Sequence, residues 1–451
     1  MARPASGDSF RSVIPSASNG FMSANPQSAG LVHIRAPKAP ATVEGTEIES
    51  TVRTILSDVA REGDDAVRRY SMRFDGAAPE RFEVSAAEKQ AAVDALDPEA
   101  REDMEFAIEQ VRRFAQAQRD TMLPLEIETL PGLHLGHRII PIRRVGAYVP
   151  GGRYPLLSAP VMTIVPATVA GCAEIVACLP PTAHQAMVAG CHLSGATRIF
   201  RIGGAQAIAA MAYGTASVPG VDKIVGPGNA YVNEAKRQVF GPVGIDQLAG
   251  PSEIYILADD TGDAATIATD LLAQAEHDVR TRVGLITTSE RLAHAVEAQV
   301  AEQLATLSTA SVAAAAWDSY GEIALVPNEA AMIAYSDQIA AEHLQIHTAA
   351  PQELAAKLSS YGSLFIGPKA SVVYSDKCCG TNHTLPTMGA GRYTGGLWVG
   401  SYLKVATHQW LEDAGVSAVA PHAVRQSARE GLEGHRRAAA IRLEAGWTGR
   451  N

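Results

Sequence analysis

The sequence predicts an α/β protein built from two doubly wound, incomplete Rossmann-like parallel-sheet domains, with a small C-terminal α domain and an N-terminal helical or extended arm. Three observations support this fold class. The 451 residues exceed the length at which one hydrophobic core stops growing. Short β-branched runs alternate with Ala-rich helical stretches, as in βαβ units. The tract Gly250-Pro251-Ser252 divides this alternation into two blocks, so two sheets are expected.

The chain opens with a polar segment that is followed by helices. Residues 1–42 begin with a Ser-, Ala-, Gly- and Pro-rich stretch that lacks the continuous apolar run of a signal peptide. We expect a flexible tail here or, alternatively, an arm that packs on a partner subunit. In residues 47–74 and 86–122, apolar side chains recur every three or four positions among charges, which predicts amphipathic helices.

Two alternating blocks occupy the middle of the chain. The first begins near residue 145, with strands expected at 175–179, 199–202 and 223–225 and helices near 160–170 and 184–193. The second has strands expected at 253–258, 283–287, 323–326, 344–347 and 363–366 and a helix at 263–275. Beyond about residue 396 the pattern becomes helical and charged, which predicts the C-terminal α domain.

The composition restricts the classes of partner. The chain has 38 basic and 48 acidic residues, and its net charge of −10 disfavours binding to nucleic acid or to an anionic membrane. No apolar run is long enough to cross a bilayer. The five cysteines are few, odd in number and scattered, which indicates a reducing compartment rather than a disulfide framework. We therefore expect a soluble, cytoplasmic protein with small-molecule partners.

Gln274 and His277 lie three residues apart at the end of the predicted helix 263–275. Residues at this spacing share a helix face, so a Gln carbonyl oxygen and an imidazole nitrogen can bind one metal ion. An exposed helix end with a histidine favoured by the helix dipole would explain the same pair.

Glu342 and His343 stand at a predicted helix-to-strand junction. We expect them at the carboxyl edge of a parallel sheet, where catalytic groups gather. Neutral imidazole can take a proton near pH 7, and a carboxylate can activate water. Adjacent charged residues in an ordinary loop would give the same dipeptide.

Asp376 and His383 are candidate metal ligands or proton carriers in a loop rich in Gly and Pro. Cys378 and Cys379 lie between them and are interpreted as packing residues, because neighbouring cysteines rarely chelate one ion and no Cys-x-x-Cys partner is present.

Three glycine-rich turns follow predicted strands, at residues 149–153, 202–206 and 226–229. Backbone amides in such turns can approach a ligand phosphate at a helix start. None of the turns fits G-x-G-x-x-G with a downstream acid, so the turns alone do not establish a dinucleotide site.

Seven tracts, taken in order, resemble the histidinol dehydrogenase family over residues 47–443. They are residues 145–152, 203–207, 222–232, 249–253, 274–277, 341–344 and 380–387. Chance agreement of seven ordered motifs is negligible. The resemblance implies a zinc-dependent NAD oxidoreductase that oxidises a primary alcohol through the aldehyde to the carboxylate, with two molecules of NAD.

The resemblance also implies site residues and an assembly. It implies zinc bound by Gln274, His277, Asp376 and His435, and NAD contacted by Tyr148, Gln206 and Asn229. The implied substrate contacts are Ser252, Gln274, His277, His343, Asp376, His383, Glu430 and His435. Family members form intertwined homodimers in which the C-terminal histidine and its upstream glutamate, here His435 and Glu430, reach into the neighbouring subunit's site.

A domain division and a division of roles follow from the same resemblance. Residues 43–147 and 252–397 are expected to form the zinc-binding catalytic domain, residues 148–251 the NAD-binding domain, and residues 398–451 a helical domain that contributes to the partner's site. Within the site, zinc would act as a Lewis acid, His343 would take protons, and Glu342 would activate water to hydrate the aldehyde.

The segment 389–404 departs from the pattern of histidine-synthesis enzymes and resembles instead a paralogous branch that includes the sulfopropanediol 3-dehydrogenases. Lys377, Arg392 and Lys404 are cations in or beside this segment that suit a sulfonate, although surface solvation explains them as well. We therefore expect a sulfopropanediol-like alcohol, with L-histidinol as the alternative. A zinc hydrolase would leave the NAD-like tracts unexplained, and an inactive binding protein would leave Glu342 and His343 unexplained.

Overall fold

The first doubly wound unit contains a parallel five-stranded sheet. The computed structural model describes residues 30–38, 46–151 and 156–444. The strands of this sheet are β4 (Arg144–Tyr148), β5 (Glu174–Leu179), β6 (Arg198–Arg201), β7 (Lys223–Val225) and β8 (Gly244–Ile245), in the order β6-β5-β4-β7-β8. Because the strand order reverses beside β4, a ligand crevice is expected outside the carboxyl ends of β4 and β7.

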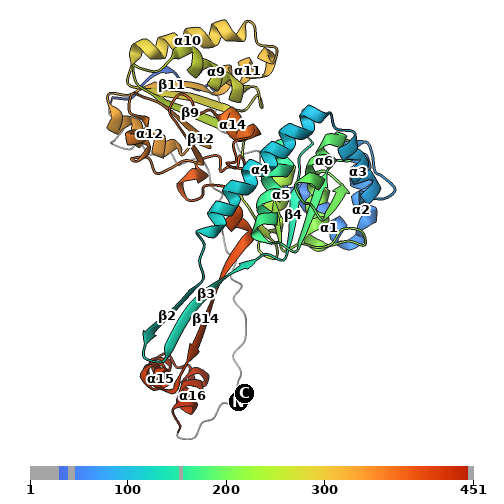
Figure 1. Cartoon of the computed structure of the whole chain (residues 1–451), viewed down its shortest axis with the longest axis vertical. Helices are drawn as coiled ribbons and strands as arrows, with labels where there is room; N and C mark the ends of the chain where they lie inside the picture. Colours follow the sequence, from blue (N-terminus) through green and yellow to red (C-terminus); the bar gives the residue numbers. More distant parts are fainter. Residues whose placement is uncertain (1–29, 39–45, 152–155, 445–451) are drawn as a thin grey trace, which may run out of the picture.

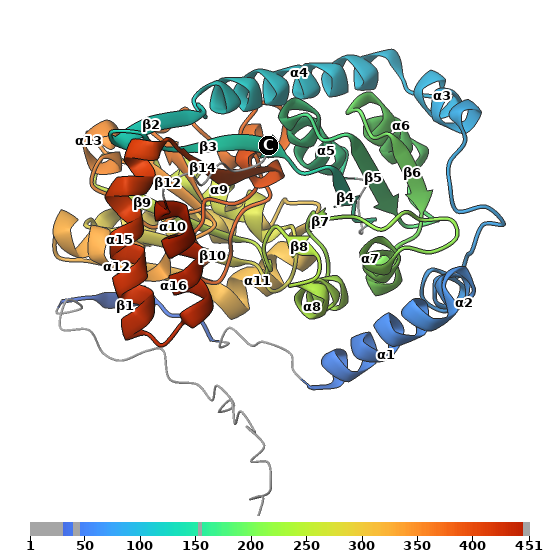
Figure 2. The same cartoon turned by 90° about the horizontal axis from the view of Figure 1, so that it is seen from below.

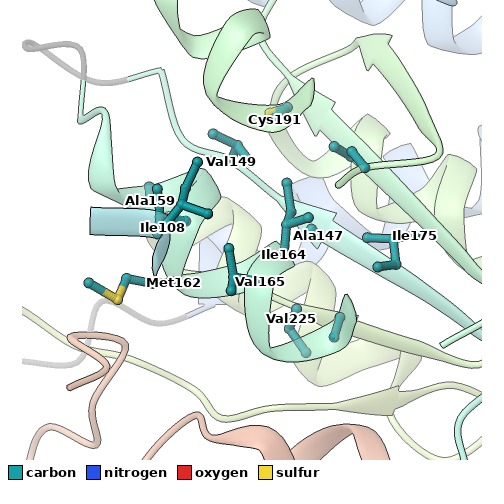
Figure 3. Close-up of a cluster of buried hydrophobic side chains, with 14 of the residues drawn as sticks. Ile108, Ala147, Val149, Ala159, Met162, Ile164, Val165, Ile175, Cys191 and Val225 are labelled. Atoms are coloured by element: carbon teal, nitrogen blue, oxygen red, sulfur yellow. The ribbon is translucent and has the colours of Figure 1, made fainter. Parts of the chain in front are cut away.

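Helices cover both faces of this sheet (Figure 2). One face packs against α3 (Ala86–Asp94), α4 (Pro98–Asp120), α5 (Ser158–Ala170) and α6 (Gln185–Leu193), and the other against α1 (Thr46–Glu62), α2 (Asp64–Asp75), α7 (Gly204–Tyr213) and α8 (Ala230–Val239). The helix α5 is almost entirely apolar and buried. Its side chains Met162, Ile164 and Val165 lie in one cluster with Ala147 of β4 and Ile175 of β5 (Figure 3). Apolar burial on both faces therefore holds the sheet together.

The position of the first four helices corrects the domain boundary expected from the sequence. Residues 43–147 were assigned to the unit that carries the second sheet. In the structure α1 and α2 contact α7, α1 also contacts α8, α3 contacts α6, and α4 contacts α5, all of them in the first unit. The apolar stripe of an amphipathic helix predicts that the helix is packed but does not identify the sheet that it covers. The first unit therefore contains α1 to α4 together with the elements from β4 to β8.

The second unit contains a six-stranded sheet in the order β1-β11-β10-β9-β12-β13. Its strands are β1 (Val32–Arg35), β9 (Glu253–Ala258), β10 (Arg282–Thr287), β11 (Gly321–Leu325), β12 (His343–His347) and β13 (Ser363–Ile366). Helices α9 (Ala264–Ala275), α10 (Glu290–Leu304) and α11 (Ala310–Tyr320) cover one face, and α12 (Glu329–Ile339) and α13 (Pro351–Ala355) the other. The five parallel strands repeat the strand order of the first sheet, so the prediction of two doubly wound units is confirmed.

The central strand β9 is buried along its whole length. Parallel strands that are covered on both faces read as continuous apolar runs, which is why residues 253–258 were recognised as a strand.

Within the described residues 30–38, 46–151 and 156–444, no helix is both long and apolar enough to cross a membrane.

The edge strand β1 lies within the segment predicted as a flexible tail or arm. It pairs antiparallel with β11 of its own chain, so residues 32–35 belong to the second unit. The rest of that prediction, on residues 1–29 and 39–42, lies outside the described residues.

A lobe formed by β2, β3, β14, α15 and α16 extends away from the two units (Figure 1). Its elements are β2 (Leu125–Leu130), β3 (Leu133–Pro141), β14 (Leu403–Leu411), α15 (Asp413–Arg429) and α16 (Glu433–Ala440), and the three strands pair antiparallel in the order β14-β3-β2. The sequence predicts a helical domain over residues 398–451. The helices α15 and α16 lie in this range, but the nine-residue strand β14 precedes them and corrects the first part of the prediction. Every residue of β2 is exposed, and β14 is mostly exposed. This ribbon therefore has no continuous buried face that would mark it as a sheet.

Short elements complete the chain. They are α14 (Val372–Lys377) and the 3-10 helices η2 (Ala390–Arg392), η3 (Val399–Tyr402) and η4 (Ile441–Leu443).

Candidate active site

The predicted catalytic pair and three of the four predicted metal ligands lie at the amino edge of the second sheet. His343 is the first residue of β12, and Glu342 precedes it. Because α9 returns from the end of β9 to the start of β10, its last turn, with Gln274, lies at the same edge. The expectation that Glu342 and His343 stand at a carboxyl edge was therefore wrong. A helix-to-strand junction in a βαβ unit belongs to the edge where the strands begin.

Hydrogen bonds fix the tautomer of His343. Its Nδ1 lies 2.9 Å from the backbone oxygen of Glu253. A carbonyl oxygen can only accept, so Nδ1 carries the proton. Nε2 is buried and has no hydrogen-bond partner among the described residues. The backbone N–H of Glu253 donates to Glu342 Oε2 at 2.8 Å, and this oxygen lies 3.5 Å from His343 Nδ1. In its neutral form, His343 therefore presents Nε2 as the proton-accepting nitrogen.

Nearby carboxylates control the charge of His343. Burial alone would lower its pKa, but the charge and hydrogen bond of Glu342, with a smaller contribution from the charge of Asp376, outweigh burial and raise the pKa to about 9. The imidazolium is therefore favoured at neutral pH. A cation bound beside Asp376 would oppose this effect and favour the neutral base.

Three of the four predicted metal ligands lie at this edge. His277 Nε2 is 3.9 Å from Asp376 Oδ2. Zinc bonds to imidazole nitrogen and carboxylate oxygen are about 2.0–2.2 Å long, so this separation allows both atoms to bind one ion. Gln274 is buried, and its Nε2 has no hydrogen-bond partner in the described structure.

The fourth predicted ligand lies elsewhere. His435 is exposed on α16 of the lobe, and Glu430, which follows α15, is exposed as well (Figure 1). In the described part of a single chain, no group of three or more His, Cys, Asp or Glu side chains is arranged to hold a metal ion. One chain therefore brings together Gln274, His277 and Asp376 but not His435.

The loop after α14 connects this edge to the first unit. His383 Nε2 lies 2.9 Å from Ser158 Oγ, and Asn382 Nδ2 donates to the backbone oxygen of Met162 at 2.8 Å, both on α5. Burial lowers the pKa of His383 despite the opposing charge of Asp376. Ser252, the last predicted substrate contact, immediately precedes β9 at the same edge of the sheet.

The three predicted NAD contacts gather at the carboxyl edge of the first sheet. Tyr148 ends β4, Gln206 lies in the first turn of α7, and Asn229 follows β7. The Tyr148 hydroxyl accepts from the backbone N–H of Gly204 at 3.1 Å, and burial raises the pKa of Tyr148 to about 12. Gln206 Nε2 donates to Asp75 Oδ2 at 3.2 Å, while its buried Oε1 has no partner among the described residues. These groups lie at the edge where doubly wound sheets bind ligands.

Asn229 already has a structural role. Its Oδ1 accepts from the backbone N–H groups of Tyr231 and Val232, each at 3.1 Å, and so caps α8. The preceding loop lies close against β4. Gly226 has φ +115°, and a Cβ at this position would lie 2.1 Å from the backbone oxygen of Tyr148. Only glycine therefore fits this turn.

The structure adds two acidic residues that the sequence analysis did not select. Glu253 contacts both Glu342 and His343, and Asp75 contacts Gln206. Glu253 gives a recognisable signal, because it opens an otherwise apolar strand and Arg282 opens the next strand. Asp75 gives no such signal, since it stands at the end of an amphipathic helix that is rich in charges.

A cavity of about 240 Å³ lies beside the site, between α4 and the loops around residues 361–364 and 380–398. Phe114, Leu397 and Trp398 contribute to its lining, and none of the predicted site residues does. Gly362 also lines the cavity, and its backbone N–H donates to the Ala341 carbonyl at 2.9 Å. The structure thus assigns the cavity no role in the predicted chemistry.

Comparison with known proteins gives consistent results over most of the chain. Residues 39–443 match the model of the family described as histidinol dehydrogenase. The chain is 48% identical over 406 residues to histidinol dehydrogenase homolog 1 of Mesorhizobium japonicum, covering 89% of this chain and 81% of that protein. It is 42% identical over 410 residues to sulfopropanediol 3-dehydrogenase of Ruegeria pomeroyi, covering 89% and 93%. The crystal structure of histidinol dehydrogenase from Elizabethkingia anophelis matches with a TM-score of 0.86 at 34% identity, covering 90% of this chain and 94% of that one.

Proposed function

The chain belongs to the histidinol dehydrogenase family of NAD-dependent oxidoreductases, and from this premise we propose that it oxidises a primary alcohol through the aldehyde to the carboxylate with zinc and two molecules of NAD. The observation that carries the proposal is the buried Nε2 of His343 beside Glu342, which has no hydrogen-bond partner in the described part of the chain. A base for removing a hydroxyl proton needs such a nitrogen. The cytoplasm suits a reaction that consumes NAD.

His343 and Glu342 have different tasks in this proposal. His343 takes the hydroxyl proton on Nε2, and the Glu253 carbonyl stabilises the imidazolium through Nδ1. Glu342 activates the water that hydrates the aldehyde. NAD, when bound, would supply the hydride acceptor for each of the two oxidations. Burial of both side chains excludes bulk water from the reacting atoms.

The donor set at the amino edge of the second sheet fits zinc. Gln274, His277 and Asp376 offer oxygen, nitrogen and oxygen, and the separation of the last two suits a common ion. Bound there, zinc would supply Lewis-acid chemistry that lowers the pKa of the alcohol. Tyr148, Gln206 and Asn229 would contact NAD across the crevice of the first sheet.

The lobe supports an intertwined homodimer with shared sites. It exposes apolar side chains that a monomer would leave in water: Leu125, Ile127, Leu130, Val405, Trp410, Leu432, Ile441 and Leu443. Glu430 directly follows α15 and His435 lies on α16 of the same lobe, whereas Asp376 lies on α14 beside the second sheet. Figure 1 shows α15 and α16 at the far end of the lobe from α14. A partner subunit that packs on the lobe would receive His435 as its fourth zinc ligand and Glu430 as a substrate contact.

The favoured substrate is a small, sulfopropanediol-like alcohol, with L-histidinol as the alternative. Relatives that carry either name share this family, and His383 and Ser252 stand where substrate contacts are expected. The test follows NADH absorbance with purified protein and each alcohol in turn. We expect kcat/KM for the two alcohols to differ by about 10⁴-fold in favour of sulfopropanediol, because a mismatched substrate leaves buried polar groups unpaired. Oxidation of L-histidinol with no NADH from sulfopropanediol would reverse the assignment.

A further inference from the structure

The backbone of one residue, Glu253, holds both members of the catalytic pair. Its N–H donates to Glu342 Oε2 at 2.8 Å, and its carbonyl accepts from His343 Nδ1 at 2.9 Å. Glu253 is the first residue of β9, the strand between β10 and β12. A small movement of this residue would therefore displace the carboxylate and the imidazole together.

The side chain of Glu253 is fixed in turn by an ion pair. Glu253 is fully buried, and its Oε1 accepts from Arg282 Nη1 at 3.0 Å. The two residues are register partners at the start of adjacent parallel strands. Arg282 Nη2 also donates to the Tyr255 hydroxyl at 3.3 Å, and this hydroxyl donates to Glu322 Oε2 at 2.7 Å. Arg282 thus links Glu253 to a hydrogen-bond network inside the sheet.

A carboxylate at this position is unfavourable for the stability of the sheet. The other residues of β9 are apolar, and Glu342 places a second carboxyl group beside Glu253. Burial raises the pKa of Glu253, the charge of Arg282 opposes this rise, and the charge of Glu342 adds to it. An apolar side chain would pack here without the loss of hydration that both charges suffer. The buried ion pair is therefore better explained by its effect on the positions of Glu342 and His343 than by a contribution to the stability of the sheet.

Two strained residues lie next to the partners of Glu253. Among the described residues, the non-glycine residues with positive φ are Ala340 at 51° and Met388 at 54°. Ala340 stands two residues before Glu342, and the backbone N–H of Met388 donates to Glu253 Oε1 at 3.2 Å. Such conformations persist only where the surrounding structure holds them. Glu253 thus also connects the catalytic pair to the loop that follows His383.

We propose that Glu253 is a positioning residue for Glu342 and His343, held in place by its buried ion pair with Arg282. The inference rests on the proposed function, because it takes Glu342 and His343 as the groups that act on the substrate. Glu253 itself need not touch the substrate. Its role is to keep His343 Nε2 free and the Glu342 carboxylate in reach of the same reacting carbon.

The test compares Glu253→Gln with a matched control in the first sheet. Arg144 and Glu174 are also register partners at the start of adjacent parallel strands, and they form an ion pair far from the catalytic pair. In the full-length enzyme with NAD and sulfopropanediol, or with L-histidinol if that alcohol is the one oxidised, Glu253→Gln is expected to lower kcat about 100-fold with KM for NAD unchanged. Glu174→Gln is expected to keep the wild-type kcat.

A double variant separates positioning from general damage to the sheet. In a His343→Asn background, Glu253→Gln is expected to lower the residual kcat only slightly, because the pair that it positions is already disabled. Full additivity of the two losses would overturn the positioning role. Wild-type kcat in Glu253→Gln, with large losses in His343→Asn and Glu342→Gln, would overturn it too and leave the proposed function intact. Wild-type kcat in His343→Asn and Glu342→Gln would instead overturn the proposed function.

Arg282 supplies a second pair of variants in case Glu253→Gln does not fold. Arg282→Lys keeps the positive charge beside Glu253 and is expected to retain most of the wild-type kcat. Arg282→Met leaves the Glu253 carboxylate without its ion-pair partner and is expected to lower kcat strongly. Equal kcat in Arg282→Met and the wild type would overturn the proposal.

Discussion

At the scale of single residues, the chemistry depends on hydrogen bonds that sequence patterns do not contain. The motifs identified Gln274, His277, Glu342 and His343, and the structure brings these four to one edge. The tautomer of His343, however, is set by a backbone carbonyl of Glu253. Backbone groups are the same at every position, so no residue type in the sequence could have indicated this contact.

The effect of Glu342 on the pKa of His343 predicts how the pH profile of the rate responds to loss of the Glu342 charge. His343 must be neutral to accept a proton, so kcat/KM for the alcohol should rise with pH and level off above the pKa of this residue. Because the Glu342 carboxylate raises that pKa, Glu342→Gln should move the acidic limb to lower pH. Initial rates of NADH formation across pH measure this shift, with Glu174→Gln as a control that leaves the limb in place. An acidic limb unchanged in Glu342→Gln would contradict the assignment of the base.

Zinc content tests the ligand set. We expect about one zinc per chain in the purified protein and loss of the metal in both His277→Ala and His435→Ala, because removing one of four ligands leaves an incomplete site. Elemental analysis after gel filtration provides the measurement. His422 is exposed on α15 of the same lobe, and His422→Ala should retain the metal. Full zinc occupancy in His435→Ala would remove His435 from the site.

At the scale of elements, most helices and strands were predictable because local patterns determine them. The strand predicted at 253–258 coincides with β9, and the one predicted at 223–225 coincides with β7. The sheet that a helix covers was not predictable, as α1 to α4 demonstrate, since that choice depends on contacts between residues distant in the chain. The ribbon of β2, β3 and β14 was missed because much of its surface faces water on a single chain.

The turn at Gly226 gives a prediction at this scale. Gly226→Ala would place a Cβ 2.1 Å from the backbone oxygen of Tyr148, so the loop before α8 must move. Gly241 has a similar φ of +119°, but a Cβ added there would have no atom within 4 Å. Gly241→Ala therefore measures only the free energy lost when alanine adopts this backbone conformation. We expect Gly241→Ala to lose about 1–2 kcal/mol of stability and keep its KM for NAD. Gly226→Ala should lose more and raise KM for NAD.

Thermal melts and NAD titrations of the two variants decide the matter. If both variants kept the same KM for NAD, the loop of residues 226–229 would not belong to the cofactor site.

At the scale of the whole molecule, the residues proposed to contact NAD and those proposed to act on the substrate lie at opposite edges of two similar sheets. Tyr148 and Gln206 lie at the carboxyl edge of the first sheet, and His343 lies at the amino edge of the second sheet. The lobe stands apart from both (Figure 1). The residues proposed to contact NAD and the proposed base thus lie in the two units, whereas Glu430 and His435 lie on the lobe.

Shared sites predict complementation between inactive variants. In a heterodimer of His343→Asn and His435→Ala chains, one site takes both wild-type residues and the other takes neither. Unfolding and refolding an equal mixture should therefore restore about a quarter of the wild-type activity, since half of the dimers would each carry one intact site.

The control for this mixture is a pair of variants whose lesions belong to the same half of the site. Refolded mixtures of His343→Asn and Glu342→Gln should stay inactive, because every site would lack one of the two groups. Equal recovery in both mixtures, or none in either, would contradict the exchange of His435 between subunits.

The pairing of β14 with β3 has a consequence for the order in which the chain is made. Leu403 to Leu411 pair with Leu133 to Pro141, so the two strands leave the ribosome with most of the chain between them. At a translation rate of about 5–20 residues per second, roughly ten to fifty seconds pass between the synthesis of β3 and that of its pairing partner β14. During that interval the hairpin of β2 and β3 is an open edge on a nascent polypeptide, while the first sheet can already close around α5. The three-stranded ribbon of the lobe is thus completed only when nearly the whole chain has been made.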